Sequence, residues 1–182
     1  MKNELFLLFL ILFMISCNTK EVFHKTELKT LSYDEFDQIK LGLKVEQIES
    51  QLNSQYKIEK SSNKNDVIEW FIFGNESSPW QRSAIIFDKK TNAVTAKSFI
   101  PFNGEKENNL KFILENKFPD ITFEKHKLPI CKRDYMPNSI FYANVKSGIL
   151  IRYNELSNDV ESLSWTSSDE VRNKIKKLTT CN

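Results

Sequence analysis

The three cysteines and two histidines are the residues of this chain best suited to chemistry. His24 lies near the N-terminus, His126 stands five residues before Cys131, and Cys181 is the second-last residue. A thiol beside an imidazole can act as an activated nucleophile, and two thiols with an imidazole can contribute to a metal site. Two thiols of an exported chain more often pair, so we predict a Cys131–Cys181 disulfide that closes a loop of about 51 residues. The nucleophile and the metal site are the alternatives.

Carboxylates and short motifs give no support for catalysis. Asp34, Glu35 and Asp37 cluster where a helix is predicted to begin, and the helix dipole makes negative charge favourable there. The chain has four glycines and contains neither G-x-S-x-G nor H-E-x-x-H. We therefore predict a protein that is not an enzyme and that uses no cofactor or metal. The alternative, a hydrolase whose active-site residues are dispersed along the chain, has no motif in its favour.

The N-terminus predicts where the protein works. An unbroken apolar run extends from Leu5 to Ile15 and is followed by Ser16 and Cys17. Eleven helical residues cover about 17 Å, which is short for a hydrocarbon core of about 30 Å but suits a signal peptide. The sequence Met14-Ile15-Ser16-Cys17 resembles the lipobox of bacterial lipoproteins. The resemblance implies a signal peptide over residues 1–16, cleavage after it, and acyl chains such as palmitate on Cys17.

Lipid on Cys17 would hold the mature chain on a membrane without crossing it, because more than one acyl chain is needed for stable anchoring. Asn18, by comparison with lipoproteins, favours the outer membrane, at its periplasmic face or at the cell surface. The polar residues 17–31 would then form a tether between the lipid and the folded part. The alternatives are an ordinary signal peptide and an uncleaved anchor with an incidental cysteine.

Composition and loop residues point to a protein partner. The formal net charge is only +2 and no block of lysine or arginine occurs, so we predict no nucleic-acid partner. Trp80 and Arg82 in one predicted loop region, and Arg133 and Tyr135 in another, are candidate contact residues, because interfaces are enriched in Trp, Tyr and Arg. The alternative is that the rings of these loops pack into the core.

Residues 32–101 predict two helices followed by three antiparallel strands. Ser32 and Glu35 form a capping-box pattern at the start of the first helix. The second helix is predicted from an apolar stripe at helical spacing, and the strands from β-branched and aromatic runs bounded by turn residues. In the third strand we place Thr95, Lys97 and Phe99 on one face. The stripe is Val45, Ile48 and Leu52, and the strands are residues 66–74, 82–88 and 93–101.

Residues 102–182 predict a second block of α and antiparallel β structure. It has one leading helix, then strands, and a C-terminal helix that carries Val171, Ile175 and Leu178. His126 is predicted to lie on a solvated strand face. Lys174, Lys176 and Lys177 suit the C-terminal end of the helix dipole and, alternatively, anionic headgroups. We predict an α+β protein whose two blocks lie either on one shared sheet or on two. The strands are expected at residues 121–128, 139–145, 148–154 and 160–166.

A family resemblance lies in the first block. The stretch FDQIKLGLKVEQIESQL, a strand with Trp70, and AIIFDKKTNAV resemble the SmpA/OmlA family, the small lipoprotein of the outer-membrane β-barrel assembly machinery. They resemble more broadly the β-lactamase-inhibitor-protein-like fold. The resemblance implies a helix-helix-three-strand unit that contacts other envelope proteins.

The prediction is therefore a non-catalytic envelope lipoprotein that acts by protein–protein binding, with outer-membrane assembly or maintenance implied by the resemblance. The alternative is an inhibitor or immunity lipoprotein that blocks a secreted or imported enzyme.

Overall fold

The chain folds as α+β, as the sequence predicts. The computed structural model describes residues 29–52, 56–62, 66–73, 82–101, 105–132 and 136–181. Cys17 and most of the predicted tether, residues 17–31, lie outside these ranges. Leu31, at the end of that predicted tether, is buried to 2% exposure, so the folded part begins before residue 32.

The first half has two helices and four strands, one strand more than predicted. Ser32 caps the first helix, and its hydroxyl and the Glu35 carboxylate form the complete capping box. The additional strand is the edge strand of the sheet, and its sequence KIEKSS is mostly polar. The elements are α2 (Tyr33–Asp37), α3 (Val45–Leu52), β1 (Lys57–Ser62), β2 (Val67–Phe73), β3 (Arg82–Asp88) and β4 (Ala93–Phe99).

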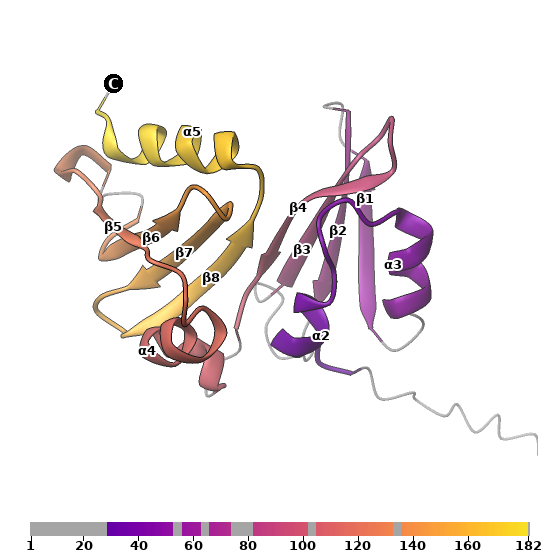
Figure 1. The fold of residues 1–182 in the computed structure, drawn as a ribbon, viewed down its shortest axis with the longest axis horizontal. Coiled ribbons are helices and arrows are strands. Elements are labelled where there is room, and N and C mark those ends of the chain that lie inside the picture. Colours follow the sequence, from indigo (N-terminus) through magenta and orange to yellow (C-terminus); the bar gives the residue numbers. More distant parts are fainter. Residues whose placement is uncertain are drawn as a thin grey trace, which may run out of the picture.

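The second half adds a short helical region, four strands and a C-terminal helix (Figure 1). The predicted leading helix is a single α-turn followed by a π-helical turn. The elements are η2 (Lys106–Asn108), α4 (Leu110–Phe112), η3 (Ile113–Lys117), β5 (Glu124–Lys127), η4 (Ile130–Lys132), β6 (Ser139–Asn144), β7 (Ile149–Asn154), β8 (Asp159–Trp165) and α5 (Ser168–Thr179).

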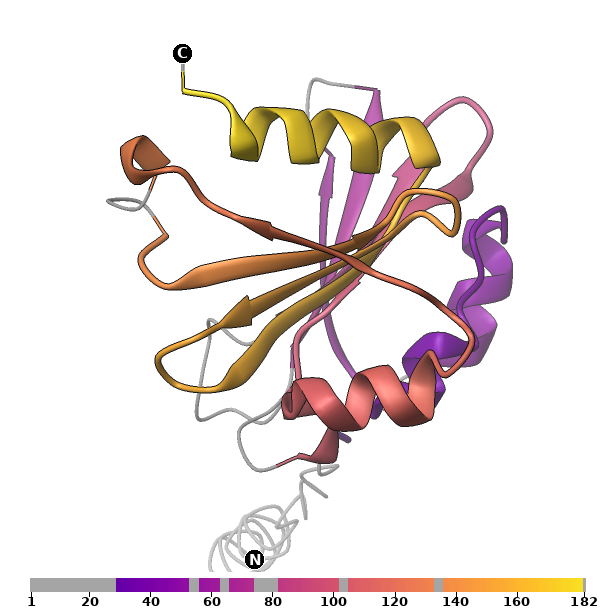
Figure 2. The same cartoon turned by 60° about the vertical axis from the view of Figure 1, so that its left-hand side comes forward.

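All eight strands form one antiparallel sheet in the order β1-β2-β3-β4-β8-β7-β6-β5, so both halves share a sheet. The halves meet at β4 and β8, which pair at three positions, with Ser98 opposite Ser164 in the middle. The two Ser hydroxyl oxygens are 3.0 Å apart. Figure 2 shows the two groups of strands spreading from this junction.

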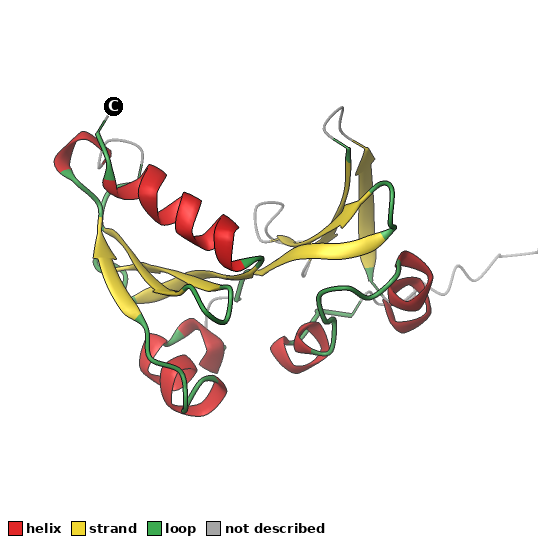
Figure 3. Ribbon diagram, turned by 45° about the horizontal axis from the view of Figure 1, so that its top comes forward, coloured by secondary structure: helices red, strands yellow, loops and turns green. Residues whose placement is uncertain are grey.

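The two faces of the sheet are covered differently. Helices α2, α3 and α4 lie on one face, whereas α5 lies on the other (Figure 3). The first face carries the main core, which draws on both halves and includes Trp70, Phe99 and Trp165. Beneath α5 a smaller core joins Val171 to Phe141, Ala143 and Leu150.

The hairpins β3–β4 and β7–β8 have the same construction. Asp88 and Asn154 each accept backbone N–H bonds from residues two and three further on. Asn92 and Asn158 follow with φ of 51° and 62°, and each hairpin has a register shift within its ladder. When these shared features are aligned, residues 82–99 correspond to residues 148–165 without an insertion or deletion. The identical positions are Ile85 and Ile151, Asn92 and Asn158, Val94 and Val160, and Ser98 and Ser164.

The correspondence between the two halves extends from the hairpins to β2 and β6, and to β1 and β5 outside them. Asp66 and Asn138, which precede β2 and β6, both have positive φ, and their carbonyls accept from Lys89 and Glu155 at equivalent hairpin positions. Lys60 lies over the ring of Trp70, and Lys125 lies in the same way over Tyr142. The two halves therefore repeat one strand arrangement about the Ser98–Ser164 pair.

Two predicted side-chain orientations are wrong. The register shift next to Thr95 reverses the alternation of β4, so Val94 lies on the core face together with Lys97 and Phe99. His126 is not on a solvated face: its side chain is 21% exposed and its Nε2 is buried without a hydrogen-bond partner among the described residues. It lies opposite Phe141, on the side of the sheet that α5 covers.

Candidate binding surface

Most of the predicted contact residues fall outside the described residues. Cys17, Trp80, Arg133 and Tyr135 all do so, and their roles stay predictions. Arg82 is described: it is exposed at the start of β3, and its guanidinium carbon lies 4.3 Å from the centre of the Phe71 ring. The structure therefore places this one candidate at a surface that the sequence did not reveal, the free face of β2.

Cys131 and Cys181 are paired in the structure, with their Cα atoms 6.1 Å apart. This separation lies within the usual range for a disulfide. The pairing joins η4 to the residues that follow α5, so the far end of the C-terminal helix is fixed to the rest of its half.

No helix that the structure describes covers the α5 side of the first-half strands, and we call this side the open face. Strand alternation places Glu69 of β2 on this side, opposite Ile86. It also directs five apolar side chains there: Phe71 and Phe73 of β2, Ala84 and Ile86 of β3, and Ala96 of β4. All five are half-buried, because strand neighbours cover part of each side chain while no described helix lies over them. A row of adjacent apolar side chains open to solvent on one face is typical of an interaction site.

Cations border the open face at its outer edge. The Lys57 ammonium lies 5.0 Å from the centre of the Phe73 ring, and Arg82 covers Phe71. Such cation–π contacts hold the charges over the rings while leaving them accessible to a partner. Glu59 of β1 lies on the same face, opposite Phe71, so the outer edge combines aromatic surface with charges of both signs.

A groove separates the open face from α5. It has a volume of about 590 Å³ and runs between Ile86 and Ala96 on the sheet and Glu170 and Lys174 on α5. A second hollow of about 430 Å³ continues along α5 past Lys177. The hydroxyls of Ser98 and Ser164 lie at the junction that both hollows share. Volumes of this size match ligand-binding clefts, which are about 300–1,000 Å³.

The α5 wall carries Glu170 and Lys174 in the groove and Lys177 in the second hollow. Lys174 and Lys177 lie one turn apart on α5, and neither makes an ion pair with any residue that the structure describes. Arg152 also lines the groove, but it is paired with Glu161 and donates to the Ser139 hydroxyl. The two lysines are therefore the charges most available to a bound anion.

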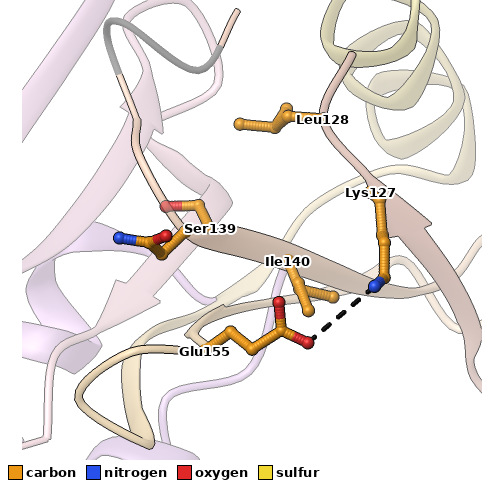
Figure 4. A pocket seen from close by; sticks show the side chains of 6 residues that line it. Lys127, Leu128, Ser139, Ile140 and Glu155 are labelled. Atoms are coloured by element: carbon orange, nitrogen blue, oxygen red, sulfur yellow. Dashed lines mark ion pairs between the residues drawn. The ribbon is translucent and has the colours of Figure 1, made fainter. Parts of the chain in front are cut away.

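A third hollow is too small for a ligand of that size. It encloses about 120 Å³ between β5, β6 and the β7–β8 turn. Figure 4 shows Lys127 and Glu155 facing each other across it, with 3.9 Å between Lys127 Nζ and the Glu155 Oε1. The space suits a few water molecules beside Ser139.

Lys97 is a titratable residue that is buried in the core beside Phe99. Its residue is 3% exposed, its Nζ donates to the Phe36 carbonyl over 3.0 Å, and it lies 4.5 Å from the centre of the Trp165 ring. Burial lowers its pKa to about 8, and the Asp37 carboxylate only partly opposes this effect. Because its ammonium donates to the Phe36 and Asp37 carbonyls of α2, Lys97 is a structural cation of the core, and the residue also forms part of the groove lining.

No metal site is found among the described residues: they contain no group of three or more His, Cys, Asp or Glu side chains placed to hold an ion. Within the same residues, no helix has the length and apolar character needed to cross a membrane.

Comparison of the chain with protein families, with curated proteins and with solved structures found no match in any of the three. The function has to be argued from the surface itself.

Proposed function

We propose that this chain is a membrane-anchored envelope lipoprotein that acts by binding another protein. The observation that carries the proposal is the open face: apolar side chains on strands β2 to β4 that no described helix covers, bordered by both cations and carboxylates. A soluble domain without a partner gains nothing from an uncovered apolar sheet face, whereas a binding protein uses it as the centre of an interface.

The predicted anchor suits such a role. Residues 18–28 link the acylated Cys17 to the first described residue, Lys29, and an extended chain spans at most about 3.6 Å per residue. The folded part would therefore stay within about 40 Å of the lipid. Restriction to a membrane surface raises the effective concentration of a partner that is itself in the membrane.

The resemblance to the SmpA/OmlA family supports outer-membrane assembly or maintenance as the process served. The structure departs from the implied unit in having a fourth strand, β1, and a second half on the same sheet. In our proposal these additions extend the unit without replacing its binding role.

The test is a cross-linked pull-down of the lipidated protein from intact cells, followed by mass spectrometry. Enrichment of β-barrel assembly subunits would support a role in outer-membrane assembly. A single secreted or imported hydrolase would instead support an inhibitor or immunity lipoprotein. The absence of any enriched protein would overturn protein binding as the function.

A further inference from the structure

The second hollow, beside α5 in the second half, is lined by apolar side chains that continue the smaller core. Its volume is about 430 Å³, within the range of clefts that bind small molecules. Phe141 and Leu150 on its sheet side belong to the core beneath α5, and Met136 and Leu178 pack against that core. An apolar group placed in this hollow would therefore extend an existing hydrophobic cluster.

The charged side chains that line the second hollow are all cations. Lys174 and Lys177 come from α5 and Arg152 comes from β7, and no carboxylate of the described part of the chain lines it. Two carboxylates lie close by: Glu161 is paired with Arg152, and Glu170 lines the neighbouring groove one turn before Lys174. Since Glu161 neutralises only Arg152, the two lysines leave the hollow with an excess of positive charge.

Arg152 is held in place by one edge of its guanidinium group. Its Nε is ion-paired with Glu161 and donates to the buried Ser139 hydroxyl over 3.3 Å. Glu161 in turn accepts from the Asn154 amide over 3.1 Å. The two Nη groups make no hydrogen bond with any described residue, and the side chain is 34% exposed. An arginine fixed in this way keeps two donors for a carboxylate or a phosphate.

Serine hydroxyls add further donors along the sheet side of the hollow. Ser98 and Ser164 are bonded to each other, and because only one of the two can donate in that bond, the other keeps its proton for a ligand. Ser162 lies directly opposite Arg152 in the β7–β8 ladder and also lines the hollow. Charged N–H donors and hydroxyls beside an apolar floor favour a ligand that has both an anionic group and an apolar part.

We propose that the second hollow binds an anionic amphiphile. Its carboxylate or phosphate is bound by Arg152, Lys174 and Lys177, and its hydrocarbon chain contacts Phe141 and Leu178. The ligand is either a lipid of the membrane to which the chain is predicted to be anchored, or a free fatty acid or alkyl phosphate; all share this chemistry. The site is separate from the open face, so the inference goes beyond the proposed function.

The helix dipole alone does not account for these lysines. A cation anywhere in the last turns of α5 is favourable, and Lys176 satisfies that condition as well as its neighbours do. Lys174 and Lys177 are three residues apart and so lie on the same side of α5, whereas Lys176 does not line the hollow. Lys176 is therefore a suitable control position.

The experiment is photolabelling of the full, lipidated chain in vesicles of phosphatidylcholine, whose headgroup has no net charge. The probe is a photoreactive fatty acid, and the matched probe is the alcohol with the same chain. Mass spectrometry locates the attached probe. We expect the acid to attach to the segments that contain Met136, Phe141 or Leu178, and the alcohol to label them at least about tenfold less. Equal labelling by the two probes, or attachment of the acid only at other segments, would overturn the inference.

Two double variants with the same change of charge test the binding of the anionic group. Lys174→Gln with Lys177→Gln should reduce labelling by at least about tenfold, because two charged donors to the anion are lost. Arg172→Gln with Lys176→Gln, which alters exposed positions outside the hollow, should leave labelling within about twofold. Equal losses in the two variants, at unchanged melting temperatures, would overturn the inference.

Competition against the photoreactive acid separates the possible ligands. Displacement by phosphatidylglycerol added to the vesicles would support the inference with a bilayer lipid as the ligand. Displacement by dodecyl phosphate but not by phosphatidylglycerol would support it with a free amphiphile. Inorganic phosphate that competes as well as dodecyl phosphate would show a site for the anion alone and would overturn the inference. The assay contains no partner protein, so its failure leaves the proposed function standing.

Discussion

Burial of Lys97 makes the free energy of unfolding depend on pH. Its folded-state pKa is about 8, lowered from 10.5 mainly by burial. Between these two values the unfolded chain binds a proton that the folded chain does not, so the free energy of unfolding rises with pH in this window. Below pH 8 Lys97 is charged in both states, and the cost of burying its charge is present in full.

We therefore expect Lys97→Met to be more stable than the parent chain below pH 8, by about 1–3 kcal/mol, since replacing a buried charge by an apolar side chain of similar size is often stabilising. The advantage should shrink as the pH rises from 8 to 10.5. Urea unfolding at several pH values measures it, with Lys90→Met, on an exposed turn, as the control. A constant difference between Lys97→Met and the parent across this range would contradict the assignment.

At the scale of elements, the turn between β6 and β7 fixes the start of α5. Gly148 has φ of 67°, and a Cβ added there would lie 2.0 Å from the Thr166 carbonyl oxygen. Backbone has to move to relieve such a contact, and Thr166 leads directly into α5. We expect Gly148→Ala to destabilise the protein by more than about 2 kcal/mol, through backbone strain and displacement of the helix.

Gly42 is a natural control for this change. Its φ is also positive, at 87°, but a Cβ would meet nothing within 4 Å. Gly42→Ala should therefore cost only the conformational strain, about 1 kcal/mol. Thermal unfolding of both variants separates the cost of backbone strain from the cost of the contact between the added Cβ and Thr166. Equal losses of stability in the two variants would show that the contact with Thr166 is not important.

The elements themselves follow from the sequence to a large degree. The strands around Trp70, Ile85 and Val94, and the helix carrying Val171, occur where apolar periodicity predicts them. Strand β1 was missed because an edge strand that is mostly polar has no such period. Val94 was predicted on the face opposite to Lys97 and Phe99, because a register shift changes the alternation without leaving a mark in composition.

The candidate site was harder to predict than the elements. Phe71 and Ile86 have the same residue types as core positions, and only the placement of α5 on the other half of the sheet leaves them uncovered. That placement depends on tertiary packing between residues far apart in the chain. The loop candidates Trp80 and Tyr135 were chosen by residue type alone, which identifies interface residues without showing where the surface lies.

At the scale of the whole molecule, the two halves repeat their strands and share the main core, while the smaller core beneath α5 belongs to the second half. The ring of Phe36 in α2 lies 5.4 Å from Phe99 and 6.0 Å from Trp165, so the first helix packs against strands of both halves. Lys117 of the second half forms an ion pair with Asp34 over 2.8 Å and lies over the ring of Tyr33. The predicted blocks, residues 32–101 and 102–182, are thus joined through packing as well as through the sheet.

One shared core predicts one unfolding transition. If β1–β4 opened alone, Trp165 and Leu163 would lose the aromatic cover of α2 and the pairing with β4, which exposes apolar surface on β8. We expect amide protection in β2 and in β7 to be lost at the same urea concentration, measured by hydrogen exchange and mass spectrometry. Trp165→Ala should lower that concentration equally for both strands, because the ring contacts elements of both halves. Protection that persists in β7 after β2 has exchanged would show instead that the repeated halves fold independently, and that the contacts of α2 with β8 contribute little to holding them together.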